Sequence, residues 1–302
     1  MASANDRGHH PVLARLAYKI DCARQAAESA LDIVFDQDAI VGYGGRSMVF
    51  LSETAILKIY THRPAERAER EITGLTLTAA APGLQVPEVL GHDSVDGALA
   101  WVSATRLDGA APTDPHDDQA TALLGAIAAR LHRLPKQSLA GLAPFRRNIR
   151  QLPDDDHPVR TRLTAVLAKA EQDQTSGCVP GFVYGDFSAR NVLLAPGTDP
   201  GVIDFEDCGT GCVYEDLTTL YAQNCLIDGR DVHQALTAYQ AESARLGRAI
   251  EFDPRHLLLH TARYFRWVLQ WAIGIDTELA DQVTELAPRV LDGLEAEGTP
   301  PL

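Results

Sequence analysis

Residues 183–206 constrain the fold of this chain most, because they set acidic and amide side chains into short apolar runs. These runs predict short buried strands at residues 183, 192–194 and 202–203. The turn at 195–201, which contains Pro and Gly, predicts that the last two strands form a hairpin. Asp186, Asn191 and Asp204 would then lie at strand ends and in loops around one cleft.

This set of polar residues suits phosphoryl transfer from a nucleotide. In that chemistry an Asp orients the attacking hydroxyl and takes its proton, while an Asn and a second Asp hold the Mg²⁺ that bridges the phosphates. The spacing Asp186-x-x-x-x-Asn191, followed by Ile-Asp204-Phe, matches the catalytic loop and the metal-binding Asp of kinases in the same order. The alternative is that Asp186 and Asn191 are ordinary turn residues between strands.

The same segment resembles the aminoglycoside phosphotransferase family, the antibiotic-kinase branch of the protein-kinase-like fold. That family usually has His-Gly-Asp-x-x-x-x-Asn, and Tyr184 stands here at the position of the His. The resemblance implies an α+β, bilobal protein-kinase-like fold. A small antiparallel-sheet lobe would cover residues 1–105, and a larger, mainly helical lobe would cover residues 106–302. We expect activity to survive with Tyr184, because its hydroxyl can hydrogen-bond in place of the imidazole.

A glycine-rich turn lies upstream, where residues 42–49 read Gly-Tyr-Gly-Gly-Arg-Ser-Met-Val between two expected strands. A following strand fits the phosphate loop of kinases, whereas a dinucleotide-binding fingerprint runs into a helix. Without a Cβ, glycine lets backbone amides approach phosphate oxygens closely. A tight hairpin turn is the simpler alternative. The expected nucleotide-binding residues in this turn are Gly42, Gly44, Gly45 and Ser47.

Lys58 lies inside an apolar strand expected over residues 55–60, Ala-Ile-Leu-Lys-Ile-Tyr. A buried ammonium needs an anion beside it, either a phosphate or a carboxylate, unless the Lys is on an edge strand and points to solvent. A helix expected over residues 64–80 offers several acids. Its segment Arg-Glu71-Ile-Thr-Gly-Leu resembles the Arg-Glu-x-x-x-Leu segment of the family. The resemblance implies that Glu71 holds Lys58, which contacts the α and β phosphates.

The strand expected over residues 99–107 would lead out of the small lobe, with Trp101 and Val102 lining an adenine pocket. In kinase-like folds, backbone groups of the segment between the lobes read the edge of the base. Those groups would belong here to Ser103 and Thr105. Side-chain type does not identify the amide involved, because every residue except Pro carries an N–H group.

The resemblance also assigns the remaining roles of the reaction. Asp186 would be the catalytic residue, Asn191 and Asp204 would bind Mg²⁺, and ATP would be the phosphoryl donor, with GTP as a possible substitute. Arg190, inside the catalytic loop, could stabilise charge that develops on the phosphate. An Arg that faces solvent or pairs with an Asp is an equally good interpretation of the same residue.

The expected partner is a small-molecule substrate, either an antibiotic or a metabolite, and three hypotheses for the function stay open. The first is a kinase that inactivates a cationic antibiotic of the aminoglycoside or basic peptide type. The second is a kinase of a metabolite such as choline, homoserine or a sugar, and the third is a nucleotide-binding module without catalysis. Three acidic residues are expected to bind a cationic acceptor. They are Asp186 itself and the two acids directly after the metal-binding Asp, Glu206 and Asp207.

Composition excludes several classes of partner. The chain has 302 residues, 45% of them hydrophobic, which is enough for the cores of two lobes. Its 27 Lys and Arg against 41 Asp and Glu give a formal net charge of −14. This charge argues against nucleic acid and anionic membranes as partners, and it suits a cationic substrate, although acidic surfaces mostly serve solubility.

The five cysteines predict free thiols, and we expect a cytoplasmic monomer or homodimer.

Helical periodicity predicts most of the remaining chain as helix. The expected helices cover residues 11–31, 120–134, 158–172, 218–225, 232–247, 255–273 and 280–295. His132 is expected to be a structural residue at a helix end. Asp216, in a Gly-x-x-x-x-Asp-Leu segment that the family also has, is expected to cap the start of a helix.

Overall fold

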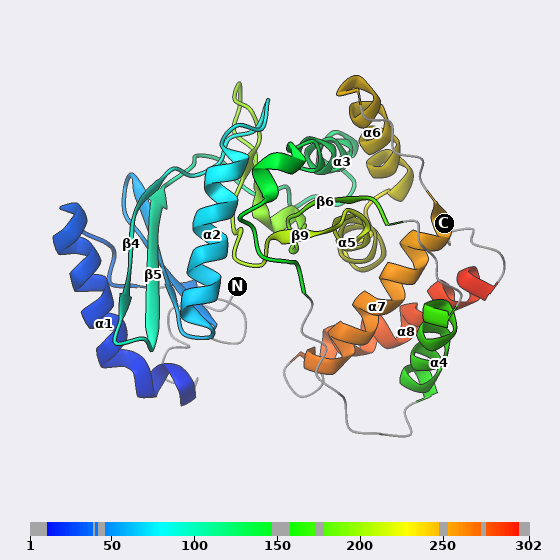
Figure 1. Ribbon diagram of the computed structural model, residues 1–302, viewed down its shortest axis with the longest axis horizontal. Helices are drawn as coiled ribbons and strands as arrows, with labels where there is room; N and C mark the ends of the chain where they lie inside the picture. Colours follow the sequence, from blue (N-terminus) through cyan, green and yellow to red (C-terminus); the bar gives the residue numbers. More distant parts are fainter. Residues whose placement is uncertain are drawn as a thin grey trace. The chain divides into compact units, whose positions relative to one another are not determined.

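The computed structural model describes residues 11–38, 40–41, 46–146, 158–172, 178–247, 253–272 and 276–295 (Figure 1). The chain divides into two compact units. The first unit comprises Met1–Ala110 with Leu193–Cys208, and the second comprises Ala111–Val192 with Gly209–Leu302.

The first unit is built on an antiparallel sheet of five strands in the order β1-β2-β3-β5-β4. The strands are β1 (Ile40–Val41), β2 (Ser47–Leu51), β3 (Ala55–Tyr60), β4 (Val89–Val95) and β5 (Leu99–Thr105). β3 and β5 pair in the middle of the sheet and are almost wholly buried, so their apolar residues need cover on both faces. The antiparallel sheet expected for the small lobe is therefore confirmed.

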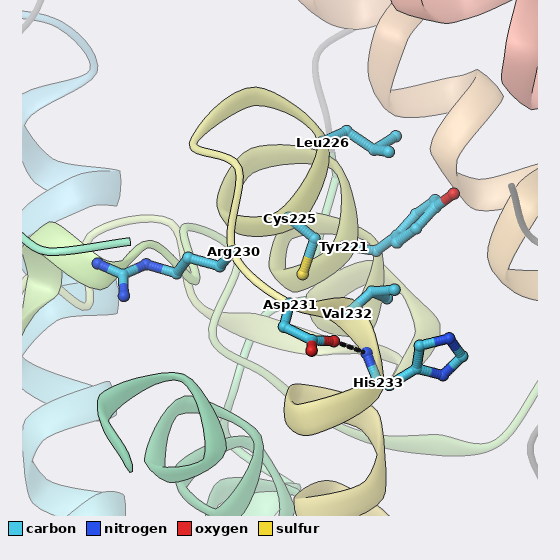
Figure 2. A pocket seen from close by; sticks show the side chains of 7 residues that line it. All are labelled: Tyr221, Cys225, Leu226, Arg230, Asp231, Val232 and His233. Atoms are coloured by element: carbon cyan, nitrogen blue, oxygen red, sulfur yellow. Dashed lines mark hydrogen bonds between the residues drawn. The ribbon is translucent and has the colours of Figure 1, made fainter. Parts of the chain in front are cut away.

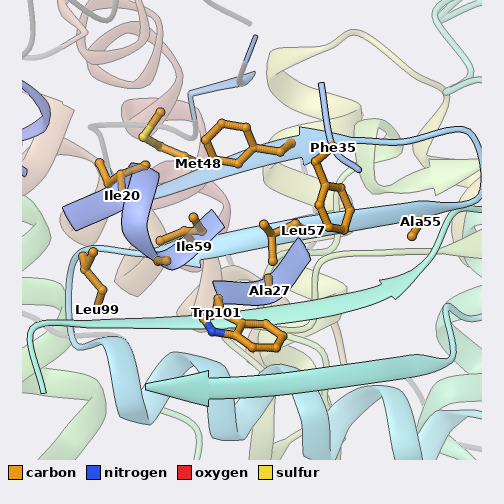
Figure 3. Packing of buried hydrophobic residues seen from close by; sticks show 11 residues of the cluster. Ile20, Ala27, Phe35, Met48, Ala55, Leu57, Ile59, Leu99 and Trp101 are labelled. Atoms are coloured by element: carbon orange, nitrogen blue, oxygen red, sulfur yellow. The ribbon is translucent and has the colours of Figure 1, made fainter. Parts of the chain in front are cut away.

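α1 (Pro11–Leu31) covers one face of this sheet (Figure 1). Figure 3 shows the core on this face, where Ile20 and Ala27 of α1 pack with sheet residues such as Leu57 and Trp101. The small Ala side chains let the helix approach the sheet closely. Trp101 belongs to this core, and strand alternation puts it on the face opposite Lys58, so it does not line a pocket beside Lys58.

α2 (Pro64–Thr78) covers the other face of the sheet (Figure 1). Ala68 of α2 packs there with Tyr60 of β3 and Val102 of β5. The helix begins with Pro, whose fixed φ and missing N–H suit the first helical position. Because Lys58 lies opposite Val102 in the β3–β5 pair, its side chain is on this α2 face.

The hairpin predicted around the turn at 195–201 is present. β7 (Val192–Leu193) and β8 (Gly201–Val202) form a two-stranded sheet. Within the first unit, Val202 N donates to Gln85 O at 2.9 Å, which joins the second strand of the hairpin to the segment before β4.

The second unit is mainly helical. Its α-helices are α3 (Asp118–His132), α4 (Pro158–Gln172), α5 (Tyr214–Thr219), α6 (Val232–Arg245), α7 (Pro254–Ala272) and α8 (Thr277–Glu295). α3 packs on α6, and α7 packs on α8 (Figure 1). At the first of these contacts, a Cβ on Gly125 would lie 1.9 Å from Ala235 O, so only glycine permits this approach. In the described part of the chain, no helix combines the length and the apolar character needed to cross a membrane.

Two features of the second unit differ from the sequence-based expectation. The helix expected over residues 218–225 starts earlier, as α5, and continues as the π-helix η5 (Leu220–Ile227). β6 (Pro180–Val183) pairs with β9 (Gly209–Cys212), a strand that its Gly-Thr-Gly-Cys sequence does not predict. All five cysteines are free, as expected, and Cys208, Cys212 and Cys225 are buried.

Candidate functional site

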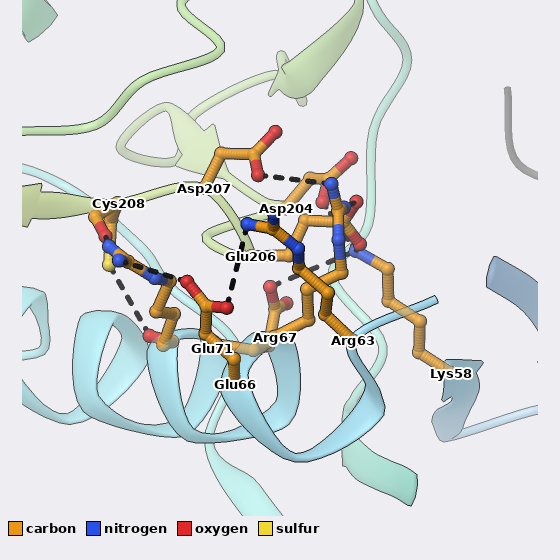
Figure 4. A network of polar contacts seen from close by, with 10 residues as sticks. Lys58, Arg63, Glu66, Arg67, Glu71, Asp204, Glu206, Asp207 and Cys208 are labelled. Atoms are coloured by element: carbon orange, nitrogen blue, oxygen red, sulfur yellow. Dashed lines mark hydrogen bonds and ion pairs between the residues drawn. The ribbon is translucent and has the colours of Figure 1, made fainter. Parts of the chain in front are cut away.

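Lys58 lies within β3, on the α2 face of the sheet, and only 6% of its surface is exposed. Its Nζ lies 3.8 Å from Glu71 Oε2 and 2.6 Å from Glu206 Oε2, and it also forms an ion pair with Asp204 (Figure 4). The structure thus brings Lys58 together with Glu71 and Asp204, and it adds Glu206, which the sequence analysis placed in the acceptor pocket.

The charges of this cluster are strongly coupled. Burial lowers the pKa of Lys58, but the carboxylates of Asp204, Glu206 and Glu71 outweigh it and hold the pKa well above the usual value. Burial raises the pKa of Glu71 to about 8, although Lys58 opposes this shift. Burial also raises the pKa of Glu206. The ammonium of Lys58 is therefore charged over the whole physiological range and can bind an anion.

Arg67 is a member of this cluster that the sequence analysis missed. It lies one turn before Glu71 on α2 and is 8% exposed. Its guanidinium forms an ion pair with Glu206, and its Nη2 lies 3.3 Å from Asp207 Oδ1. Glu206 is therefore held between two cations, whereas the side chain of Asp207 is 44% exposed. The signal in the sequence is the i, i+4 spacing from Glu71, which puts both side chains on one face of the helix.

The segment that carries Asp204 is attached to α2 at further points. Arg70 Nη1 donates to Cys208 O at 2.6 Å, and Cys208 Sγ lies 3.3 Å from Arg70 O. A Cβ on Gly74 would lie 2.7 Å from Phe205 Cβ, so the helix and this segment are in close contact. Asp204 itself has a φ of 69°, a conformation that is uncommon outside glycine and that its surroundings must hold in place.

In the second unit, the loop of residues 186–191 brings Asp186 and Asn191 together. Asn191 Nδ2 donates to Asp186 O at 3.0 Å and to Asp186 Oδ2 at 3.1 Å. The loop ends in the short 3-10 helix η4 (Ala189–Asn191), and Arg190 Nε donates to Ser188 Oγ at 3.0 Å. Asn191 is buried, whereas Asp186 and Arg190 are exposed to solvent.

Asp216 has a different role from the expected one. The residue at the start of α5 is Val213, without a side-chain cap, and Asp216 lies in the first turn, fully buried. Its carboxylate accepts hydrogen bonds from Tyr184 N at 2.7 Å and Gly185 N at 2.8 Å, and its Oδ2 lies 3.0 Å from His132 Nε2. The prediction of a helix cap is therefore wrong, because the carboxylate points to the backbone before Asp186 rather than to the amides of its own helix.

The two aromatic positions beside this carboxylate are buried. His132 has 1% of its surface exposed, and its Nδ1 lies 3.0 Å from Tyr239 OH, which confirms the expected structural residue at the end of α3. Tyr184 is also 1% exposed, and its ring meets the edge of Phe187 with centroids 6.0 Å apart.

The residues expected to bind the nucleotide are placed only in part. Ser47 begins β2 and is buried, opposite Tyr60 of β3. Ser103 Oγ donates to Ile56 O at 2.9 Å, and Thr105 N donates to Glu88 O at 2.9 Å. The amide of Thr105 therefore already has an acceptor. Three expected residues lie outside the described residues, namely Gly42, Gly44 and Gly45.

The donor atoms at the two expected metal ligands fit Mg²⁺. Because Asn191 donates through Nδ2 to Asp186, its amide oxygen is the atom left to bind a metal, and Asp204 supplies a carboxylate that is 35% exposed. Oxygen donors of this kind suit Mg²⁺, which usually takes one or two protein ligands together with phosphate and water. Among the described residues, no group of three or more His, Cys, Asp and Glu side chains has the arrangement of a metal site.

Known structures share this fold over nearly their whole length. A thermostable mutant of aminoglycoside phosphotransferase APH(4)-Ia, in its apo form, has a TM-score of 0.67 and 14% identity, over 91% of this chain and 100% of that chain. The microcompartment-associated aminopropanol kinase has a TM-score of 0.64 and 18% identity, over 92% and 98%. The GDP and kanamycin complex of APH(2")-IIia has a TM-score of 0.60 and 16% identity, over 94% and 100%.

These likenesses show the protein-kinase-like fold that the sequence predicted. No curated protein sequence matched the chain. The model of the phosphotransferase enzyme family, however, matches residues 41–252, which include the loop of residues 186–191, Lys58 and Asp204. The chain therefore belongs to the phosphotransferase enzyme family.

Proposed function

We propose that this protein transfers the γ-phosphoryl group of ATP, or of GTP, to a hydroxyl of a small cationic antibiotic of the aminoglycoside or basic peptide type, and so inactivates it. The observation that carries the proposal is the contact between Asn191 and Asp186 in one loop. It fixes a buried amide beside an exposed carboxylate. Phosphoryl transfer requires such a pair, because it uses a metal ligand next to a base.

The catalytic roles follow from the chemistry of each side chain. Asp186 orients the acceptor hydroxyl and takes its proton. Asn191 Oδ1 and the Asp204 carboxylate would hold Mg²⁺, which would supply neutralisation of the phosphate charge. Lys58, held by Glu71, binds the α and β phosphates, and its raised pKa keeps it cationic for that purpose.

The nucleotide would be bound mainly by backbone groups, with residues 1–105 acting as the nucleotide lobe and residues 106–302 as the catalytic and acceptor lobe. Ser103 and Thr105 would read the base through groups other than the Thr105 amide, which donates to Glu88. Arg190 is exposed and could approach the transferred phosphoryl group. The residues proposed for the phosphate loop are Gly42, Gly44, Gly45 and Ser47.

Most of the rate would come from positioning and from charge neutralisation, since the carboxylate of Asp186 is a weak base. The hydrogen bond from Asn191 fixes that carboxylate before substrate arrives. The chain's contribution is therefore a loop with a fixed conformation around the carboxylate.

A cationic acceptor is supported by the charge of the chain and by the acids after Asp204. The formal net charge is −14, which attracts cations over distance. Of the two proposed acceptor residues, Glu206 already faces Lys58 and Arg67, so Asp207 is the more available carboxylate. One similar structure is a ternary complex of an APH(4)-Ia mutant with AMP-PNP and hygromycin B, and another holds GDP and kanamycin.

A metabolite kinase is the second candidate. It is favoured by the similarity to an aminopropanol kinase, whose TM-score of 0.64 is close to the values for the antibiotic kinases. The same catalytic residues would serve a small amino alcohol. A nucleotide-binding module without catalysis is the third candidate, and the presence of Lys58, Asp186, Asn191 and Asp204 together argues against it.

The test is growth of a sensitive bacterium that expresses the chain, across a panel of aminoglycoside, basic peptide and nucleoside antibiotics. The control is the Asp186→Ala variant at equal protein level. Protection against one class that the control loses would support an antibiotic kinase and identify its substrate. If the chain protects against no drug, the purified protein is assayed for ATP consumption with a set of amino alcohols and sugars. Consumption that depends on one of these compounds would support the metabolite kinase.

A further inference from the structure

Asn224 lies in the π-helix η5 and is completely buried. Its Oδ1 accepts a hydrogen bond from Ala189 N at 2.8 Å, and its Nδ2 donates to Phe187 O at 3.0 Å. Both backbone groups belong to the loop that runs from Asp186 to Asn191. The side chain of Asn224 therefore satisfies one donor and one acceptor of that loop at the same time.

Few side chains can make this pair of contacts. A primary amide offers an acceptor oxygen and a donor nitrogen on one planar group, and Asn presents them on a shorter stem than Gln. A carboxylate at this position would face the Phe187 carbonyl without a proton to donate. An aliphatic side chain would leave the Ala189 amide and the Phe187 carbonyl without these partners in a buried place, which is costly.

The π-helical turn contributes to the placement of Asn224. Nδ2 of Asn224 also lies 3.4 Å from Thr219 O, five residues earlier, and Arg230 N donates to Asn224 O at 3.0 Å. π-helical turns are rare, and they occur frequently at functional sites. Tyr221 and Cys225 of the same helix line a cavity of about 200 Å³ (Figure 2). The helix therefore presents Asn224 to the loop and these two side chains to the cavity.

Asn224 and Asp216 hold the loop on opposite sides of Asp186. Asp216 binds the amides of Tyr184 and Gly185, just before Asp186. Asn224 binds the groups of Phe187 and Ala189, just after it. The backbone on both sides of the exposed carboxylate is thus fixed by buried side chains from α5 and η5.

We infer that Asn224 is a positioning residue for phosphoryl transfer, because it fixes the backbone between Asp186 and Asn191 through Phe187 and Ala189. The inference rests on the proposed function. Because the base and one proposed Mg²⁺ ligand are at the two ends of the same loop, loosening that loop would disturb both together. Positioning errors of this kind lower turnover by about 10²-fold.

The experiment compares Asn224→Ala with Gln223→Ala in the full-length protein. Gln223 is a matched control because it is a buried amide of the same π-helix, and its side chain hydrogen-bonds to Asp228 and Tyr264, which lie outside the loop. We expect Asn224→Ala to lower kcat about 10²-fold and to raise the Mg²⁺ concentration for half-maximal turnover of ATP, at a melting temperature close to that of the control. Gln223→Ala should change neither quantity.

Hydrogen exchange at the Ala189 amide gives a readout that does not depend on activity. We expect exchange to rise about tenfold in Asn224→Ala, with little change in Gln223→Ala. If Asn224→Ala does not fold, Asn224→Ser, which keeps a short acceptor, is measured in its place. Unchanged exchange at Ala189, or equal losses of kcat in both variants, would overturn the inference. A wild-type protein that transfers no phosphoryl group would instead overturn the proposed function, and the exchange data would still decide the loop contact.

Discussion

Lys58 Nζ and Glu206 Oε2 lie 2.6 Å apart, in side chains that are only 7% and 14% exposed. The other oxygen of Glu206 pairs with Arg67. Glu206 is therefore shared by two buried cations, and Lys58 is bound by carboxylates before any nucleotide arrives. A phosphate that binds Lys58 would have to compete with Glu206 and Asp204 for the ammonium.

Replacing Arg67 should destabilise the protein much more than replacing the nearby Arg63. Arg67→Met leaves the buried carboxylate of Glu206 with a single cation, and breaking a buried pair costs roughly 3–5 kcal/mol. Arg63 pairs with Glu66 at 3.7 Å in side chains that are 46% and 48% exposed, and surface pairs contribute only about 0–1 kcal/mol. Urea unfolding measures the free energy of unfolding of Arg67→Met and of Arg63→Met relative to wild type. If both variants lose the same free energy, the Arg67 pair is not important for stability.

Replacing Asp216 should reduce activity, although the residue is far from Asp186 in sequence, because its carboxylate holds the backbone just before Asp186. In Asp216→Asn a neutral amide replaces the carboxylate that accepts from Tyr184 N and Gly185 N. Both donors then lose a charged acceptor, and one of them faces an NH2 group that cannot accept a hydrogen bond. We expect kcat to fall by about 10²-fold through displacement of the catalytic loop. Steady-state kinetics with ATP checks this, and the exposed Asp118→Asn of α3 serves as the control. Wild-type kcat in Asp216→Asn would contradict the structural role.

A Cβ at Gly125 should destabilise the contact between α3 and α6. The added atom would lie 1.9 Å from Ala235 O, and a backbone oxygen cannot rotate away as a side chain can. We expect Gly125→Ala to cost at least about 1–3 kcal/mol. Gly141→Ala is the control, because nothing lies within 4 Å of its Cβ position. Thermal unfolding compares the two variants, and equal melting temperatures would show that the contact between α3 and α6 does not require glycine at position 125.

Glu242 should stabilise the protein at neutral pH and lose this effect in acid. Hydrogen bonds from Arg245 and Arg130 lower the pKa of Glu242 from 4.5 to about 2. A lowered pKa means that the stabilisation is fully present above pH 4.5 and disappears as the pH falls toward 2. We expect Glu242→Gln to be less stable than wild type at pH 7, with the difference shrinking in that interval. Denaturant unfolding at several pH values measures it, and a difference independent of pH would refute the assignment.

Local sequence patterns predicted much of the fold. The bounds expected for α1, β3 and α4 are those observed, because each is set by short-range periodicity and by a Pro or a turn at its edge. β9 was missed, because Gly-Thr-Gly-Cys has no alternation and pairs only because β6 lies beside it. The π-helix η5 was missed as well, since its apolar spacing over eight residues resembles that of an α-helix.

The candidate site was predictable only where its residues form motifs along the chain. Lys58 and Glu71 were found through their segments, and the structure places them 3.8 Å apart. Arg67 and Asn224 were not found, because their partners are 139 and 35 residues away in sequence, at Glu206 and Ala189. The spacing from Glu71 puts Arg67 on the same face of α2, but no local pattern identifies a partner as distant as Glu206 or Ala189, so these contacts become visible only in the folded chain.

Transfer of the γ-phosphoryl group from ATP by wild type and by Asp186→Asn tests the central claim most directly. Because the variant keeps the shape of the side chain and removes the base, we expect turnover to fall by about 10²–10⁴-fold while ATP binding is unchanged. The measurement is the rate of ADP formation with the acceptor identified by the growth panel, with binding followed by calorimetry. Equal turnover by the two proteins would contradict the assignment of Asp186 as the residue that orients and deprotonates the acceptor.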